Sequence, residues 1–70
     1  MLLTEIDHVA IAVRDLEAAI DYYRRAFGAE VEHREVVQRD GVEEAMLKVA
    51  ESYIQLLTPT RDDSPVAKAL

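Results

Sequence analysis

Only one segment of this chain repeats its apolar residues at helical spacing over several turns, and strand-like segments lie on both sides of it. Apolar residues recur every three or four positions from Leu16 to Phe27, which predicts an amphipathic helix. Asp15 is a suitable N-cap, and Gly28 suits the position just past the last turn. One helix can cover only one face of a sheet. The other face of the sheet must therefore be exposed to solvent or covered by another part of the protein or by a partner.

The segments of period two predict four strands. They cover residues 5–13, 30–37, 42–49 and 53–58. Between the second and third of these, residues 39–41 are typical of a hairpin turn, and Pro59 ends the fourth. With the helix after the first strand, the predicted order is β-α-β-β-β.

After the fourth strand the chain enters a connector. Ser64 is a suitable N-cap and Pro65 a suitable first helical residue, so we expect a second helix to start here and to be cut off at Leu70. The fold class is therefore α+β. We expect a single βαβββ half-module over residues 1–59, followed over residues 60–70 by a connector loop and the start of a truncated helix.

Composition limits the classes of function. A chain of 70 residues is near the lower size limit for a stable core, and without cysteine it has neither disulfides nor thiolate metal ligands. A metal ion or a partner chain is left as additional support. The net charge of −6 argues against a nucleic-acid partner. No apolar run approaches the roughly 20 residues that span a bilayer, and no signal-peptide pattern is present, so we expect a cytoplasmic protein without membrane contact.

Strand alternation indicates which side chains share a face. In the first, third and fourth strands the bulky apolar set is expected to pack on the helix. The opposite set of each strand contains one polar residue that suits a functional site: His8, Glu44 and Gln55. We infer that these three side chains point into one concavity on the face away from the helix.

The same face raises a question of stability. Apolar side chains would lie exposed on it in a lone module: Ile6, Met46, Tyr53 and Leu57. Exposed apolar patches of this kind mark interfaces, and the two free sheet edges add a tendency to pair. We therefore expect the chain to pair with a second module, either as a dimer or as half of something longer.

The polar residues of this face suit metal and proton-transfer chemistry. Neutral imidazole from His8 and the amide oxygen of Gln55 suit Co²⁺, Mn²⁺, Ni²⁺ or Zn²⁺, and a paired module would supply the missing ligands. Glu44, close to a cation and to apolar Met46, could have its pKa tuned for proton transfer.

Each of these residues also has an ordinary structural explanation. A single histidine on a strand often packs through hydrogen bonds, and a single glutamine often lies at a rim. Glu43 and Glu44 could form a solvated charged pair at the start of a strand. His33 is expected to be exposed, with acidic neighbours. The residues alone leave these alternatives open.

Four segments carry a resemblance to a known family. IDHVAIAVRDLEAAIDYYRRAFGAEV, GVEEAMLKV, YIQLLTPT and DSPVAKAL together resemble the N-terminal half of the methylmalonyl-CoA epimerase family. That family belongs to the vicinal oxygen chelate (glyoxalase/bleomycin resistance) superfamily, with the glyoxalase I and extradiol dioxygenase groups. The opening segment is typical of the superfamily as a whole, whereas the combination of all four is more specific to the epimerases.

The resemblance implies an enzyme, a metal and a set of site residues. His8 and Gln55 match metal ligands of the family, Glu44 matches a catalytic acid/base residue, and the usual ion is Co²⁺. The implied reaction inverts C2 of methylmalonyl-CoA: a proton leaves C2, the ion stabilises the enolate, and a proton returns on the opposite face.

The resemblance also implies partners for this chain. These are an acyl-CoA substrate and a second βαβββ module, from another copy of the chain or from a C-terminal half, which in the family contributes a histidine and a glutamate. A half-module alone leaves a different function open. It could bind small molecules without chemistry, or serve as a structural unit that dimerises and is inactive alone.

Overall fold

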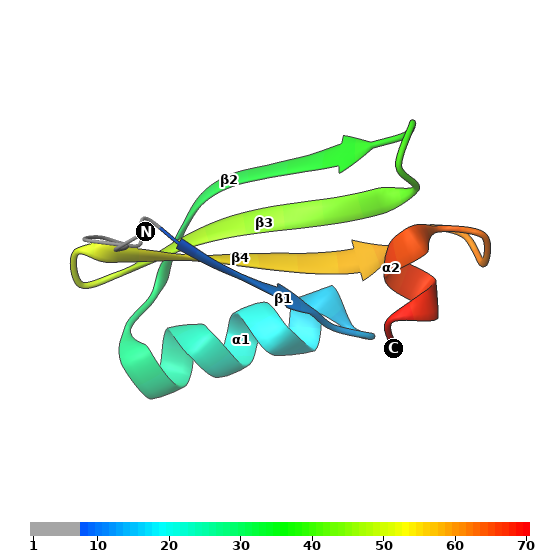
Figure 1. The fold of residues 1–70 in the computed structure, drawn as a ribbon. Helices are drawn as coiled ribbons and strands as arrows, with labels where there is room; N and C mark the ends of the chain where they lie inside the picture. Colours follow the sequence, from blue (N-terminus) through cyan, green and yellow to red (C-terminus); the bar gives the residue numbers. More distant parts are fainter. Residues whose placement is uncertain (1–7) are drawn as a thin grey trace, which may run out of the picture.

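The computed structural model describes residues 8–70 and confirms the α+β class and the predicted order of elements (Figure 1). The elements are β1 (His8–Ala12), α1 (Leu16–Phe27), β2 (Glu30–Val37), β3 (Val42–Val49), β4 (Ser52–Pro59) and α2 (Pro65–Lys68). The bounds of β2 and β3 are those predicted, and β4 is one residue longer at each end. Residues 5–7 of the first predicted strand lie outside the described residues. Within residues 8–70, neither helix combines the length and the apolar character that crossing a bilayer requires.

The four strands form one mixed sheet in the order β1-β4-β3-β2. The strand nearest the N-terminus is parallel to β4, whereas β2–β3 and β3–β4 are antiparallel hairpins. Strand β4 is therefore flanked on both sides, with Gln55 aligned with Ala10 on β1 and with Met46 on β3. This order makes β4 and β3 the central strands, and the residues they carry are surrounded by neighbours.

Helix α1 forms where the sequence provides both of its caps. The Asp15 carboxylate accepts a hydrogen bond from the backbone N–H of Ala18 at 3.0 Å. At the other end Gly28 adopts φ 67°, a left-handed conformation that a side chain disfavours, and its N–H donates to the carbonyl of Arg24 at 3.0 Å. The capped helix lies along one face of the sheet (Figure 1).

The core lies between α1 and that face. Its buried residues are Leu16, Ile20, Ala29, Ala45, Leu47 and Leu56. The three members from β3 and β4 are those that alternation assigns to the helix side, which confirms the parity argument for these strands. Phe27 departs from the predicted helix stripe, because the residue is 56% exposed. It lies in the last turn, where the ring stacks on Tyr23 with centroids 5.8 Å apart instead of reaching the sheet.

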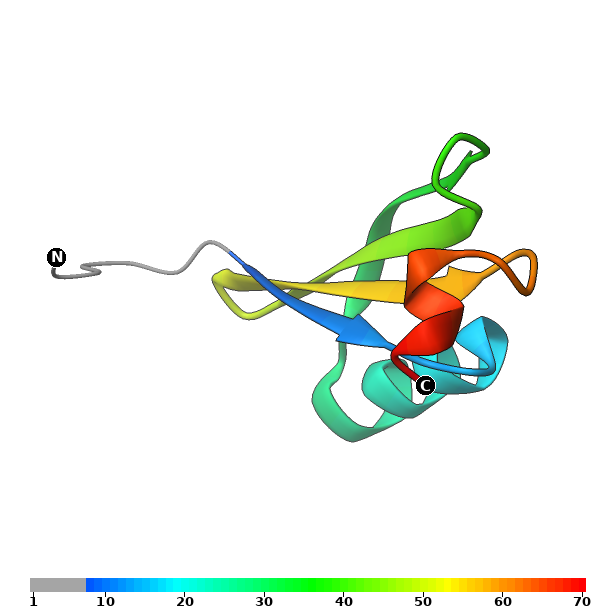
Figure 2. The same cartoon turned by 45° about the vertical axis from the view of Figure 1, so that its right-hand side comes forward.

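The connector after β4 is hydrogen-bonded to the turn of the β2–β3 hairpin. The guanidinium group of Arg61 donates to the carbonyls of Gln38 at 2.6 Å and Arg39 at 3.1 Å. The buried Ser64 hydroxyl donates to the carbonyl of Asp40 at 3.1 Å and accepts from the first turn of α2. At Gly41, φ is 64° and an added Cβ would lie 2.8 Å from Arg61 Cζ. These contacts hold α2 beside the end of β4 (Figure 2).

Candidate functional site

The face of the sheet away from α1, called the open face below, brings two of the predicted site residues into direct contact. Gln55 Nε2 donates to Glu44 Oε2 at 2.8 Å, although the two residues are eleven positions apart in the chain. They are diagonal neighbours, since Glu44 is aligned with Leu57 and Gln55 with Met46. Both side chains are half-buried. The prediction that Glu44 and Gln55 share a face is thus confirmed, whereas their chemical roles remain predictions.

The third predicted residue, His8, is described only by its backbone. It is the first residue of β1 and is aligned with Tyr53 of β4, two positions before the pair Ala10 and Gln55. Its side chain lies outside the described part of the structure, as does all of Ile6. The role of His8 as a metal ligand therefore stays a prediction.

The expected apolar patch on the open face is less exposed than predicted. Met46, Tyr53 and Leu57 are each half-buried. For Leu57 the reason is α2, which lies over this end of the face and forms a pocket with it. The short connector helix thus shields part of a surface that the strand pattern alone leaves bare.

The solvated pair considered for Glu43 and Glu44 is wrong, because these adjacent carboxylates lie on opposite faces of β3. Glu43 Oε2 accepts a hydrogen bond from Arg34 Nη2 at 2.8 Å, and the same nitrogen donates to Glu17 of α1 at 2.6 Å. These two hydrogen bonds raise the pKa of Arg34 above its ordinary value. Glu43 therefore helps to join α1 to the sheet, and Glu44 alone serves the open face.

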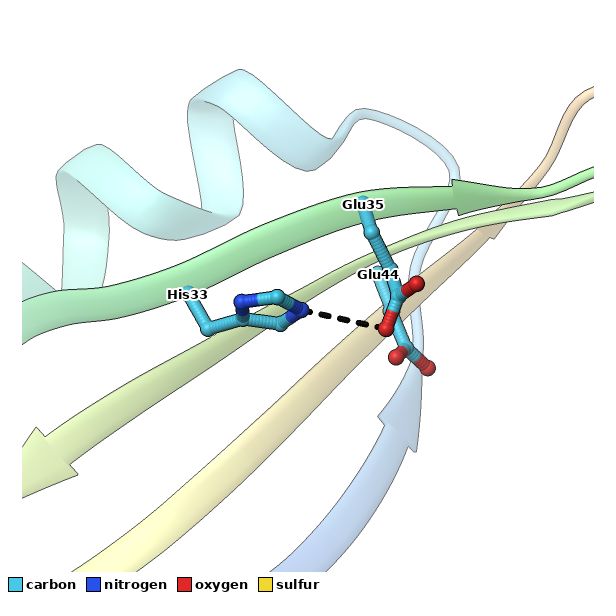
Figure 3. Close-up of side chains that lie close together, drawn as sticks. All are labelled: His33, Glu35 and Glu44. Atoms are coloured by element: carbon cyan, nitrogen blue, oxygen red, sulfur yellow. Dashed lines mark hydrogen bonds and ion pairs between the residues drawn. The ribbon is translucent and has the colours of Figure 1, made fainter.

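A second group of polar residues extends the open face onto β2. His33 Nε2 lies 3.0 Å from Glu35 Oε1, and Glu35 is aligned with Glu44 across the β2–β3 hairpin (Figure 3). One ligand atom from each of the three residues lies within 4.8 Å of the others. Hydrogen bonds with His33 and Glu44 lower the pKa of Glu35 below its ordinary value. His33 is exposed, as predicted.

Sequence reasoning missed this group because it depends on strand alignment. The spacing of His33 and Glu35 places them on one face of a strand, and that signal was available. Their meeting with Glu44 depends on the hairpin alignment, which pairs Glu35 with Glu44 and His33 with Met46.

The oxygen atoms around Gln55 are suitable ligands for a divalent cation. Because Nε2 of the Gln55 amide donates a hydrogen bond to Glu44, the amide oxygen of Gln55 is the atom that can coordinate a metal ion. Amide and carboxylate oxygens are suitable ligands for divalent ions, and the carboxylates of Glu44 and Glu35 add negative charge nearby. The residues present therefore fit the ion that the sequence predicts.

A pocket of about 270 Å³ lies beside Glu44, between the open face and α2. Its lining is largely apolar and consists of Val37, Asp40, Val42, Glu44, Leu57, Pro65 and Val66. The pocket exists because the connector is held against the hairpin by Arg61 and Ser64. The open face thus carries hydrogen-bonding groups and an apolar hollow side by side.

This fold and this face define a class of protein. Residues 7–70 match the family model of the Glyoxalase/Bleomycin resistance protein/Dioxygenase superfamily, so the chain belongs to that superfamily. Within it, the chain is 37% identical over 65 residues to the mitochondrial methylmalonyl-CoA epimerase of Bos taurus, covering 93% of this chain and 37% of that protein. It is 39% identical over 66 residues to the ethylmalonyl-CoA/methylmalonyl-CoA epimerase of Cereibacter sphaeroides, covering 94% of this chain and 49% of that protein.

A solved structure shows the same likeness. The methylmalonyl-CoA epimerase of Streptomyces coelicolor, as a variant in complex with 2-nitronate-propionyl-CoA, superposes with a TM-score of 0.87 at 51% identity. The match covers 99% of this chain and 52% of that one. These similarities confirm the predicted resemblance to the epimerases. The chain spans about half the length of this solved structure, and less than half of the two curated relatives.

Proposed function

We propose that this chain is one half-module of a metal-dependent methylmalonyl-CoA epimerase, which interconverts the 2R and 2S forms by removing and returning the C2 proton. The observation that carries the proposal is the contact between Glu44 and Gln55 on the half-buried open face. Similarity to epimerases along nearly the whole chain supports it. A second βαβββ module, from another copy or from a C-terminal half, would complete the site. We propose a cytoplasmic location, as the sequence predicts.

His8 and Gln55 would hold the metal ion from this module. We propose Co²⁺, with Mn²⁺, Ni²⁺ and Zn²⁺ as alternatives that suit the same donors. When bound, such an ion supplies positive charge that stabilises the negative charge on the substrate oxygens as C2 loses its proton. The partner module would complete the ligand set.

Glu44 would be the general base. Its carboxylate is held by the amide of Gln55, which fixes its position on β3 next to the proposed ligand. Glu44 is half-buried and borders the apolar pocket, so its carboxylate is positioned to take a proton from a substrate carbon bound beside it. The acid that returns a proton to the opposite side of C2 would come from the second module.

The proposal is tested by following exchange of the C2 proton of methylmalonyl-CoA in deuterated water, using proton NMR. With Co²⁺ we expect exchange by the parent chain and its loss on addition of a chelator. Gln55→Ala should slow exchange by at least about tenfold at limiting Co²⁺, since even outer-shell partners of a ligand are worth about 10–100-fold. Gln38→Ala, an exposed glutamine in the hairpin turn, is the matched control.

Two results would count against the proposal. Exchange that survives both the chelator and Gln55→Ala would remove the metal and its ligand from the reaction. No exchange by the parent with any of the four ions would favour the alternative of a binding or structural half-module.

A further inference from the structure

The apolar pocket borders Glu44 on the side that faces away from Gln55. Along β3 the residues of the open face are Val42, Glu44, Met46 and Lys48, and Met46 is the one aligned with Gln55. Val42 at the other end lines the pocket, together with Leu57 of β4 and Val66 of α2. Glu44 therefore lies between Gln55 on one side and the largely apolar pocket on the other.

This arrangement matches the substituents of the carbon that would react. C2 of an alkylmalonyl thioester carries a hydrogen, a carboxylate, a thioester carbonyl and an alkyl group. If Glu44 removes the hydrogen while both oxygen-bearing groups face the metal ion that Gln55 would hold, the alkyl group points away from Gln55, towards Val42 and Leu57. That is the direction of the pocket.

We infer that this pocket binds the alkyl substituent on C2 of the substrate, and that Val66 limits the length of the substituent. The inference rests on the proposed function and adds a specificity-determining residue to it. The pocket measures about 270 Å³, whereas an engineered apolar cavity of about 150 Å³ is large enough to bind benzene. Substituents longer than methyl therefore fit. Val66 lines the α2 side of the pocket. Its helix is held in place by the buried Ser64, whose hydroxyl donates to the carbonyl of Asp40.

The first test compares substrates that differ only in this substituent. The rate constant kcat/KM for C2 proton exchange is measured with methyl-, ethyl- and propylmalonyl-CoA. We expect the parent to accept all three, and Val66→Phe to lower the propyl-to-methyl ratio by about tenfold or more, the usual effect of misfitting a methylene in an apolar pocket. Val36→Phe is the matched control, because Val36 is exposed and lies on the other face of the sheet. Equal ratios in the parent and Val66→Phe would overturn the inference.

A second test needs no turnover. The methyl signals of Val42, Leu57 and Val66 are followed by NMR while free 2-methylmalonate or 2-butylmalonate is added to the parent chain. We expect these signals to shift and the affinity to rise about fourfold per added methylene, the factor that corresponds to about 0.8 kcal/mol. Pocket signals that do not respond to the butyl compound would overturn the inference even if exchange is observed. A response that depends on chain length, without any C2 exchange, would refute the proposed function and leave the pocket assignment standing.

Discussion

Glu44→Gln is expected to reduce C2 proton exchange with methylmalonyl-CoA by about 10²–10⁴-fold, the usual contribution of a positioned general base. Glutamine keeps the shape of the side chain and can still contact Gln55, but it cannot accept the proton. Because Glu44 is half-buried on the open face and takes no part in the core, the free energy of unfolding should change little. Exchange is measured in deuterated water with saturating Co²⁺, so that weaker metal binding does not contribute.

The neighbouring carboxylate provides the control for this experiment. Glu43 has the same side chain one position away, but it points to the other face of β3 and pairs with Arg34. Glu43→Gln should therefore retain exchange close to that of the parent, with at most a small loss of stability, since exposed ion pairs contribute little. Similar exchange rates in the two variants would mean that Glu44 is not the base.

Leu56→Ala is expected to lower the free energy of unfolding by about 2–5 kcal/mol, the range for a buried leucine truncated to alanine. The Leu56 side chain is fully buried between the sheet and α1, and β4, which carries it, is flanked by strands on both sides. A 70-residue domain has a total stability of only about 3–10 kcal/mol. This one substitution is therefore expected to remove a large part of it.

Urea denaturation at one fixed protein concentration measures this loss, with the concentration held constant because association would change the apparent stability. Val36→Ala is the comparison, since Val36 is exposed on the edge strand β2 and should cost less than about 0.5 kcal/mol. A loss for Leu56→Ala as small as that for Val36→Ala would contradict a core built between α1 and the sheet.

Local signals in the sequence were sufficient to predict the helices and strands of this fold. The capping residues Asp15 and Gly28 fix the ends of α1, and the change from helical to alternating period sets the start of β2. Alternation alone also placed Glu44 and Gln55 on one face, because that assignment needs only the parity of each strand.

Features that depend on contacts between distant segments were not predictable in this way. The meeting of His33 and Glu35 with Glu44 depends on the alignment of β2 with β3, which places Glu35 opposite Glu44. The pocket depends on Arg61 reaching the carbonyls of the hairpin turn, more than 20 positions away in sequence, which no periodic pattern indicates. Likewise, the exposure of Phe27 follows from where the last turn of α1 ends relative to the sheet.

Two positions on the open face are candidates for a divalent ion, and locating the ion distinguishes between them. One is the predicted position between His8 and Gln55, and the other is the group of His33, Glu35 and Glu44. Paramagnetic Co²⁺ broadens NMR signals of nearby nuclei, so a titration followed through the backbone amide signals locates it. If His8 and Gln55 hold the ion, broadening is strongest around Gln55 and the aligned residues of β1. Broadening centred on His33, with the signals of β1 unaffected, would contradict this placement.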